Sequence, residues 1–264
     1  MTSPQLTIGV LALQGAFYEH ITHLRAAADL KAGTPGSKLA TAGVDVRVIE
    51  VRTAEHLDLV DALVLPGGES TSISLIAERT GLLEPLRSFV RVEKKPVWGT
   101  CAGLILLSNE ASKAKKGGQE LIGGLAVRCQ RNHFGRQTES FSCALDLPFA
   151  CASTSENPFV AVFIRAPIVE RILPTDGTRP PGVKNVIEEG VVYAPRMESS
   201  SMLAPVEVIA QLPPQHEGDK EAGDIVAVRQ GNVFGTSFHP ELTQDVRLHA
   251  WWLEECVLPL IGGA

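Results

Sequence analysis

The chain has 264 residues, of which 44% are hydrophobic, so it is long enough to bury a core of ordinary globular size. Its 24 basic and 30 acidic residues give a net charge of −6, which does not fit a nucleic-acid-binding surface. No apolar run reaches the roughly 18 residues of a membrane span, and the first residues lack the pattern of a secretory signal. We therefore expect a cytoplasmic protein that binds neither nucleic acid nor membrane.

Short β-branched runs alternate with helical patterns over residues 1–110. Strands are expected at 6–11, 44–51, 62–65 and 96–99, and helices over 18–30, over 70–91 with a break near Gly81, and from about Cys101 onward. Strands that alternate with helices form βαβ units, in which the strands run parallel and helices cover both faces of the sheet. The first half therefore predicts an α/β fold with a mostly parallel central sheet.

The second half has a different pattern, with strands expected at 126–129, 140–145, 160–165, 225–229 and 233–238, and a helix over 245–257. Gln230-Gly231-Asn232 predicts a hairpin, because Gly and Asn tolerate a positive φ. Stretches rich in small, polar or helix-breaking residues are expected to be loop insertions near 31–41, 111–120, 174–205 and 213–223. With these insertions, a single domain over residues 1–264 accounts for the length.

The sharpest local feature is Gly99-Thr100-Cys101-Ala102-Gly103, between an expected strand and an expected helix. It is the cysteine form of the G-x-S-x-G nucleophile elbow, whose glycines permit a tight turn that projects the central side chain. A helix N-terminus also favours the thiolate. The alternative is a buried structural cysteine. No CxxC pair is present, and a structural role is expected for the other cysteines, Cys129, Cys143, Cys151 and Cys256.

A thiolate nucleophile needs a base, and the base needs an orienting group. The segment Phe238-His239-Pro240-Glu241 offers both at the end of an expected strand, because alternate residues of an extended chain face the same side. Together with the elbow, it predicts a Cys101–His239–Glu241 triad. Taken alone, the His-Pro-Glu motif is weak, and a structural role is the more common one for it. Surface or packing roles are expected for the histidines on helical patterns, His20, His23 and His249.

A glycine-rich loop, Pro66-Gly67-Gly68-Glu69-Ser70-Thr71, follows the expected strand at 62–65. Two successive glycines let backbone N–H groups approach a ligand closely. Beside the cysteine elbow, such a loop can supply an oxyanion hole for the charge that develops on an attacked carbonyl. Two alternatives stay open: a phosphate cradle, although the ending of a P-loop is missing, and capping of the next helix by Ser70 or Thr71.

Beyond these motifs, the sequence contains IGVLALQGAFYEH, LVLPGGESTSISL, PVWGTCAGLILL, RNHFGRQTESF, VFIRAP and TSFHPELT. Together they resemble the glutaminase subunit of pyridoxal 5′-phosphate synthase, a family of the class I, or triad, glutamine amidotransferases. The resemblance spans about residues 7–254, apart from the insertions, which avoid the motifs. It implies a three-layer, flavodoxin-like α/β fold with a mixed, mostly parallel central sheet. It also implies hydrolysis of L-glutamine to L-glutamate and ammonia through a glutamyl thioester, with no metal or other cofactor.

Matched position by position, the family's nucleophile falls on Cys101, its general base and acid on His239, and its orienting carboxylate on Glu241. The family's oxyanion donors match the backbone N–H groups of Gly68 and Ala102. Glutamine recognition falls on Gly68, Glu69, Ser70, Arg131, Ile164 and Arg165, with Gln14 and Gly67 close by in a second tier. The sequence leaves open which arginine pairs with the α-carboxylate, and whether Glu69 faces the α-ammonium group or orders the loop.

The resemblance also implies a partner, a synthase subunit with a (β/α)₈ barrel that uses the ammonia to build pyridoxal 5′-phosphate, or vitamin B6. Docking to that subunit is expected to organise the oxyanion loop. Two other hypotheses compete with this one. A cysteine peptidase with the same triad would need an open cleft for an extended chain, and a binding module with a dead site would be expected to lack a triad member.

Overall fold

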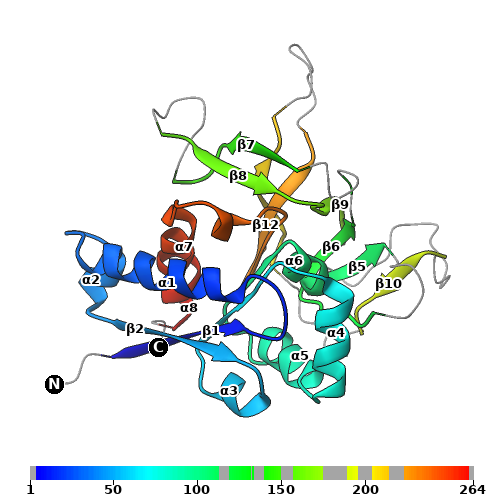
Figure 1. Ribbon diagram of the computed structural model, residues 1–264, viewed down its shortest axis with the longest axis horizontal. Helices are drawn as coiled ribbons and strands as arrows, with labels where there is room; N and C mark the ends of the chain where they lie inside the picture. The colour runs from blue at the N-terminus through cyan, green and yellow to red at the C-terminus, as the bar shows by residue number, and fades with distance from the viewer. Residues whose placement is uncertain are drawn as a thin grey trace.

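Helices cover both faces of a large mixed sheet in the computed structural model (Figure 1). The structure describes residues 4–112, 119–131, 133, 140–149, 157–174, 189–195, 204–213 and 223–261. The helices are α1 (Phe17–Ala32), α2 (Lys38–Ala42), α3 (Ala54–Asp58), α4 (Ser70–Arg79), α5 (Leu83–Arg91), α6 (Ala102–Leu107), the 3₁₀-helix η1 (Pro240–Leu242), α7 (Arg247–Trp252), the π-helix η2 (Leu253–Val257) and α8 (Leu258–Ile261). None of them is long and apolar enough to cross a bilayer.

The large sheet has the strand order β10-β5-β6-β9-β12-β13-β4-β3-β1-β2, with β11 paired to β12. Its strands are β1 (Gln5–Leu11), β2 (Asp45–Val51), β3 (Ala62–Leu65), β4 (Val97–Thr100), β5 (Ser108–Ser112), β6 (Leu125–Gln130), β9 (Ile168–Ile172), β10 (Val191–Tyr193), β11 (Glu207–Gln211), β12 (Ile225–Gln230) and β13 (Val233–Thr236). A separate antiparallel pair is formed by β7 (Phe141–Leu145) and β8 (Phe159–Phe163). From β2 to β13 all neighbours run parallel, whereas antiparallel pairs enter beyond β13. The predicted three-layer α/β fold with a mixed sheet is confirmed.

The central strands read as unbroken apolar runs because both of their faces are buried. In β3, Val64 belongs to the core beneath α1 and α7, whereas Leu63 and Leu65 belong to the core beneath α4, α5 and α6. All three side chains have 0% exposure. The sheet is therefore a rigid layer, which suits it to hold the loops at its edge in fixed positions.

Some elements differ from the sequence prediction. The strands β5, β9, β10 and β11 were not expected, and β5, with the sequence SNEAS, has no apolar alternation that could reveal it. The segment 31–41 was expected to be an inserted loop, but it includes the start of α2, whose Leu39 is buried, and Lys31 forms an ion pair of 2.8 Å with Glu254. Of the other expected insertions, residues 113–118, 175–188, 196–203 and 214–222 lie outside the described residues.

Three of the predicted motifs leave the sheet at one edge. The parallel register pairs Leu65 of β3 with Gly99 of β4, and Thr100 of β4 with Thr236 of β13. The glycine-rich loop, the cysteine turn and the His-Pro-Glu segment follow directly after these strand ends. Because ligands bind beyond the carboxyl ends of strands in open α/β sheets, this edge is the expected place for a site.

The close approach of α6 to the sheet depends on glycine. A Cβ atom added at Gly103 would collide with the carbonyl oxygen of Leu65, which is backbone and cannot swing away. We predict that Gly103→Ala lowers the free energy of unfolding by about 1–3 kcal/mol, the usual cost of overpacking. Gly33→Ala is the matched control, since φ there is −84° and the nearest atom to the added Cβ is 3.6 Å away. Urea unfolding of both variants checks this, and equal effects would contradict it.

Candidate active site

Cys101 lies at the turn between β4 and α6, as the elbow motif predicts. Its backbone has φ 46° and ψ −98°, a left-handed conformation that is strained for a residue with a side chain and costs on the order of 1–3 kcal/mol. The turn is held by a hydrogen bond of 2.8 Å that the Cys101 N–H group donates to the Thr236 carbonyl of β13. The strain and the anchoring fix the thiol at the carboxyl edge of the sheet.

His239 and Glu241 form a buried pair. The Nδ1 atom of His239 lies 2.8 Å from Oε1 of Glu241, and the His239 backbone N–H donates a hydrogen bond of 2.8 Å to the Val162 carbonyl of β8. The carboxylate only accepts hydrogen bonds, so Nδ1 carries the proton and Nε2 is left to serve another partner. We expected an extended chain to bring His239 and Glu241 to the same side, and this was wrong. The chain at Glu241 is a 3₁₀ turn that begins at Pro240.

The charges of the three residues reinforce one another. Burial by itself lowers the pKa of His239, but hydrogen bonds and charge interactions with Cys101 and Glu241 outweigh it and raise this pKa to about 10. Burial would likewise raise the pKa of Glu241, yet the interactions with His20 and His239 hold it well below its ordinary value. A protonated His239 therefore has the Glu241 carboxylate on one side and the Cys101 side chain on the other.

The other described cysteines lie in environments that disfavour a thiolate. Burial raises the pKa of both Cys129 and Cys256 to about 12, and it also raises the pKa of Cys143. Cys151 lies outside the described residues. Of the four cysteines that the structure describes, Cys101 is therefore the one placed next to a base. Within the same residues, no group of three or more His, Cys, Asp or Glu side chains is arranged to hold a metal ion.

The glycine-rich loop packs directly on this pair. A Cβ atom at Gly67 would collide with the His239 ring and lie 3.5 Å from Cβ of Cys101, so only glycine fits here. The segment before α1 braces the loop from the other side, since the Ala16 N–H group donates to the Gly67 carbonyl at 3.2 Å. Gln14 Oε1 accepts a hydrogen bond of 2.8 Å from the N–H group of Glu69. Gly67 and Gln14, expected near the site, thus lie beside it.

Glu69 caps helix α4. Its carboxylate accepts hydrogen bonds from the N–H groups of Thr71 at 3.0 Å and Ser72 at 2.6 Å, and from the Ser72 hydroxyl at 2.7 Å. Burial raises the pKa of Glu69, but these hydrogen bonds outweigh it and lower the pKa. The suggestion that Ser70 or Thr71 caps the helix was wrong, because the longer Glu69 side chain reaches both N–H groups. Of the two roles left open for Glu69, the structure shows the ordering of the loop.

Ser70 connects the loop to residues that are distant in the sequence. Its Oγ accepts a hydrogen bond of 3.0 Å from Nη1 of Arg131 and donates one of 3.3 Å to Oε1 of Gln119. Burial lowers the pKa of Arg131, although the charges of Glu69 and Cys129 act in the opposite direction. Among the described residues, Nε and Nη2 of Arg131 and Nε2 of Gln119 are buried donors that have no hydrogen-bond partner. Such donors suit an anionic or carbonyl ligand.

The structure separates the two arginines that the sequence left as alternatives. Arg131 is hydrogen-bonded to the glycine-rich loop, whereas Arg165 is exposed, with φ 45°, at the bend after β8. Ile164 and Arg165 follow Val162, whose carbonyl anchors His239, so this segment runs beside the histidine. Gln119 was not predicted, because nothing in the sequence links it to Ser70.

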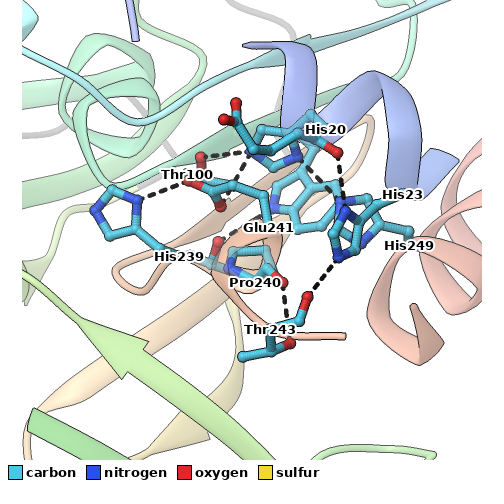
Figure 2. Close-up of polar contacts among 11 residues, drawn as sticks. His20, His23, Thr100, His239, Pro240, Glu241, Thr243 and His249 are labelled. Carbon is cyan, nitrogen blue, oxygen red and sulfur yellow. Dashed lines mark hydrogen bonds and ion pairs between the residues drawn. The ribbon is translucent and has the colours of Figure 1, made fainter. Parts of the chain in front are cut away.

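His20 and His249 were expected to have surface or packing roles. Both have 0% exposure, and their ring nitrogens contact polar groups of the site (Figure 2). His20 Nε2 lies 3.3 Å from Oε2 of Glu241, and His20 Nδ1 lies 3.0 Å from Nε2 of His249. Helical periodicity places such residues on a buried face, but it does not show which polar group they meet there.

An elbow cysteine beside a His–Glu pair at the carboxyl edge of an α/β sheet is an arrangement that triad-type cysteine enzymes share. The SNO glutamine amidotransferase family matches residues 10–187 and 181–258 of the chain. A relative from Arabidopsis thaliana, named a probable pyridoxal 5′-phosphate synthase subunit, is 39% identical over 250 residues, which cover 94% of this chain and 85% of the relative.

The pyridoxal 5′-phosphate synthase subunit SNO1 of Saccharomyces cerevisiae is also 39% identical, over 260 residues that cover 95% of this chain and 92% of the relative. A crystal structure of a glutamine amidotransferase is 34% identical and superposes with a TM-score of 0.64, covering 94% of this chain and 97% of the other. The chain therefore belongs to the SNO glutamine amidotransferase family.

The charge arrangement makes thiol reactivity measurable. We predict that iodoacetamide at pH 7 modifies Cys101 before Cys129 and Cys256, because His239, with its pKa raised to about 10, stays protonated until the pH rises through that value. His239→Asn removes this charge and should slow the alkylation of Cys101 about 10- to 30-fold, because a neighbouring cation makes a thiol more reactive.

Peptide-resolved mass spectrometry measures each rate separately. Cys129→Ala is the control, since it removes a buried thiol that lies away from the His239 ring, and it should leave the rate at Cys101 unchanged. An undiminished rate in His239→Asn would contradict the prediction.

Proposed function

We propose that this protein hydrolyses L-glutamine to L-glutamate and ammonia as the glutaminase subunit of a pyridoxal 5′-phosphate synthase, with Cys101, His239 and Glu241 as its catalytic triad. One observation carries the proposal: the cysteine turn and the His–Glu pair leave the neighbouring parallel strands β4 and β13 at the same edge. Membership of the glutamine amidotransferase family supports the substrate, and the names of the relatives support the use of the ammonia.

In the first half of the reaction, the Cys101 thiolate attacks the side-chain amide carbon of glutamine. The negative charge moves to the carbonyl oxygen, where the backbone N–H groups of Gly68 and Ala102 would stabilise it. The C–N bond then breaks, and His239 Nε2 gives its proton to the departing nitrogen, which leaves as ammonia. The product on the enzyme is a γ-glutamyl thioester of Cys101.

In the second half, His239 accepts a proton from a water molecule, which attacks the thioester carbonyl. The tetrahedral intermediate collapses and the C–S bond breaks. Glutamate is released, and the Cys101 thiolate is restored. Glu241 keeps Nδ1 of His239 protonated in both halves, so that Nε2 always faces the reacting atoms. This chemistry requires no metal and no other cofactor.

Substrate recognition would use the unpartnered donors near Ser70. The α-carboxylate of glutamine is an acceptor that could receive hydrogen bonds from Nε and Nη2 of Arg131, the buried donors described above. This favours Arg131 over Arg165 for the carboxylate. Gly68, Glu69, Ile164 and Arg165 would complete the binding site through backbone groups and shape.

The proposed partner is a (β/α)₈-barrel synthase subunit that receives the ammonia directly, because ammonia released into water at neutral pH is protonated and ceases to be a nucleophile. The oxyanion loop is the part of the site through which the synthase subunit would control glutamine hydrolysis. It is braced by Gln14 and Ala16, from the segment before α1, so a partner that moves this segment would also move the loop.

The central experiment measures glutamate and ammonia release from L-glutamine, with and without the cognate synthase subunit. We expect turnover that increases with the synthase, and loss of turnover in Cys101→Ala with retained synthase binding. Folded wild-type protein that releases no ammonia in either condition would refute the proposal. Cleavage of peptides without cleavage of glutamine would support the peptidase hypothesis instead.

A second measurement tests the recognition of the carboxylate. Arg131→Gln removes a half-buried cation that would bind the substrate, so kcat/KM should fall about 10- to 100-fold, as expected for a lost charged hydrogen bond of about 1.5–3 kcal/mol. Arg171→Gln is the matched control, because Arg171 is half-exposed and pairs only loosely, at 3.5 Å, with Glu110. A fall of the same size in both variants would contradict the assignment of Arg131.

A further inference from the structure

The second oxygen of the Glu241 carboxylate sits in an unusual position. The side chain has 0% exposure, and Oε1 is taken by His239, as described above. Among the described residues, Oε2 has no hydrogen-bond partner. A buried carboxylate oxygen without a positive neighbour is costly, because it has lost its water and gained nothing in return. The neighbour that the structure provides is His20 of helix α1, with Nε2 at 3.3 Å from Oε2.

The ring of His20 is held on three sides. Its Nε2 atom shares a hydrogen bond of 3.2 Å with Oγ1 of Thr100, the residue before Cys101. Its Nδ1 atom shares one of 3.0 Å with Nε2 of His249. The edge of Trp98 packs against it, with ring centroids 5.7 Å apart. His20 therefore has one orientation available, and in it the Nε2 atom faces Glu241 and the cysteine turn together.

His249 fixes the far side of the ring. Burial lowers its pKa well below the ordinary value, and the neighbouring His20 and His23 act in the same direction, so His249 is neutral. A neutral imidazole offers one donor and one acceptor, and the nitrogen facing His20 Nδ1 serves as one of these. Figure 2 shows the resulting chain of contacts, which runs from His239 through Glu241 and His20 to His249.

We propose that His20 is a positioning residue of the triad: its Nε2–H group faces Glu241 Oε2 as a donor, so that the carboxylate keeps the orientation that His239 needs. The proposal rests on the proposed glutaminase function. His20 does not touch the reacting atoms in this arrangement; it acts through Glu241, and His249 acts through His20.

The titratable groups around the carboxylate come from several elements. Glu241 is faced by His239, which precedes η1, and by His20 of α1. Cys101 faces His239 from the turn after β4. On the far side, His249 of α7 contacts both His20 and His23 of α1. Interactions with His20 help to lower the pKa of Glu241, so without His20 this carboxylate takes up a proton at a higher pH. His239 then loses its anionic partner, which weakens its charge interaction with the Cys101 side chain at that pH.

The first test replaces His20 by Leu, which has no donor, and by Gln, whose amide can place an N–H group near the position of Nε2. We expect kcat for glutamine to fall about 10- to 100-fold in His20→Leu, the range found when the outer partner of an oriented histidine is removed. His20→Gln should retain more activity than His20→Leu. KM should change little in both, and the acid limb of the kcat profile should move to higher pH.

The second test is a double-mutant cycle with Glu241→Gln. If His20 acts through the carboxylate, its replacement in the Glu241→Gln background should change the remaining activity by less than about threefold, because the charge that it serves is gone. His56→Gln is the control, since His56 is a partly buried histidine whose ring accepts a hydrogen bond from the Arg52 backbone, which is no part of the proposed triad.

The outcomes separate the two proposals. Wild-type kcat in folded His20→Leu, or the same fold loss with and without the Glu241 carboxylate, would overturn the role of His20. If His20→Leu does not fold, the His20→Gln cycle decides the matter. If the wild type releases no ammonia at all, the glutaminase proposal fails. The rate of Cys101 alkylation, measured against pH, then still tests His20. As the pH is lowered, this rate should fall at a higher pH in the His20 variants than in the wild type, and an unchanged profile overturns the role of His20.

Discussion

The site depends on one buried charge, the carboxylate of Glu241. A carboxylate without water is tolerated only when hydrogen-bond donors or positive charges face it. Two imidazoles do so: His239 lies two residues away in the same turn, whereas His20 belongs to the first helix of the chain. The buried acid of the candidate triad therefore has both of these neighbours only when α1 is packed on the sheet beside the loop that follows β13.

The register of the parallel strands also fixes the position of Cys101, the candidate nucleophile. Thr100 of β4 and Thr236 of β13 are paired, and the Cys101 N–H group bonds to the Thr236 carbonyl. The strained backbone of Cys101 is tolerated because Gly99 and Gly103 let α6 approach β3 at backbone distance. The strands thus fix where the two candidate catalytic residues, Cys101 and His239, leave the sheet, and the glycines allow the tight turn at Cys101.

Local patterns were enough to predict most of what a few consecutive residues determine. The bounds of β3, the break near Gly81 and the motifs around Cys101 and His239 follow from composition and spacing, and the structure contains each of them. The contacts of His20 and Gln119 could not be predicted in this way, because each joins residues that are distant in the chain.

Two further misses have the same physical origin. The polar strand β5 exists because β6 and β10 pair with it, and its own composition does not call for a strand. The cap of α4 is Glu69 rather than Ser70, because side-chain reach and backbone direction decide the hydrogen bonds, and the sequence shows neither. In both places, contacts with residues outside the local segment or the backbone geometry determine the structure, and local sequence propensity does not.

The two halves of the site are prepared to different degrees. Around Glu241, a ring nitrogen of His239 and one of His20 already face the two carboxylate oxygens, so this part of the candidate site is in place without a ligand. Around Ser70, buried donors of Arg131 and Gln119 have no partner among the described residues. An unpaired buried donor costs about 1–3 kcal/mol, and a ligand with a carboxylate would remove that cost on binding. The unpaired donors therefore favour a ligand that brings a carboxylate or a carbonyl oxygen to this end of the candidate site, whereas the Glu241 end already has its polar neighbours in place.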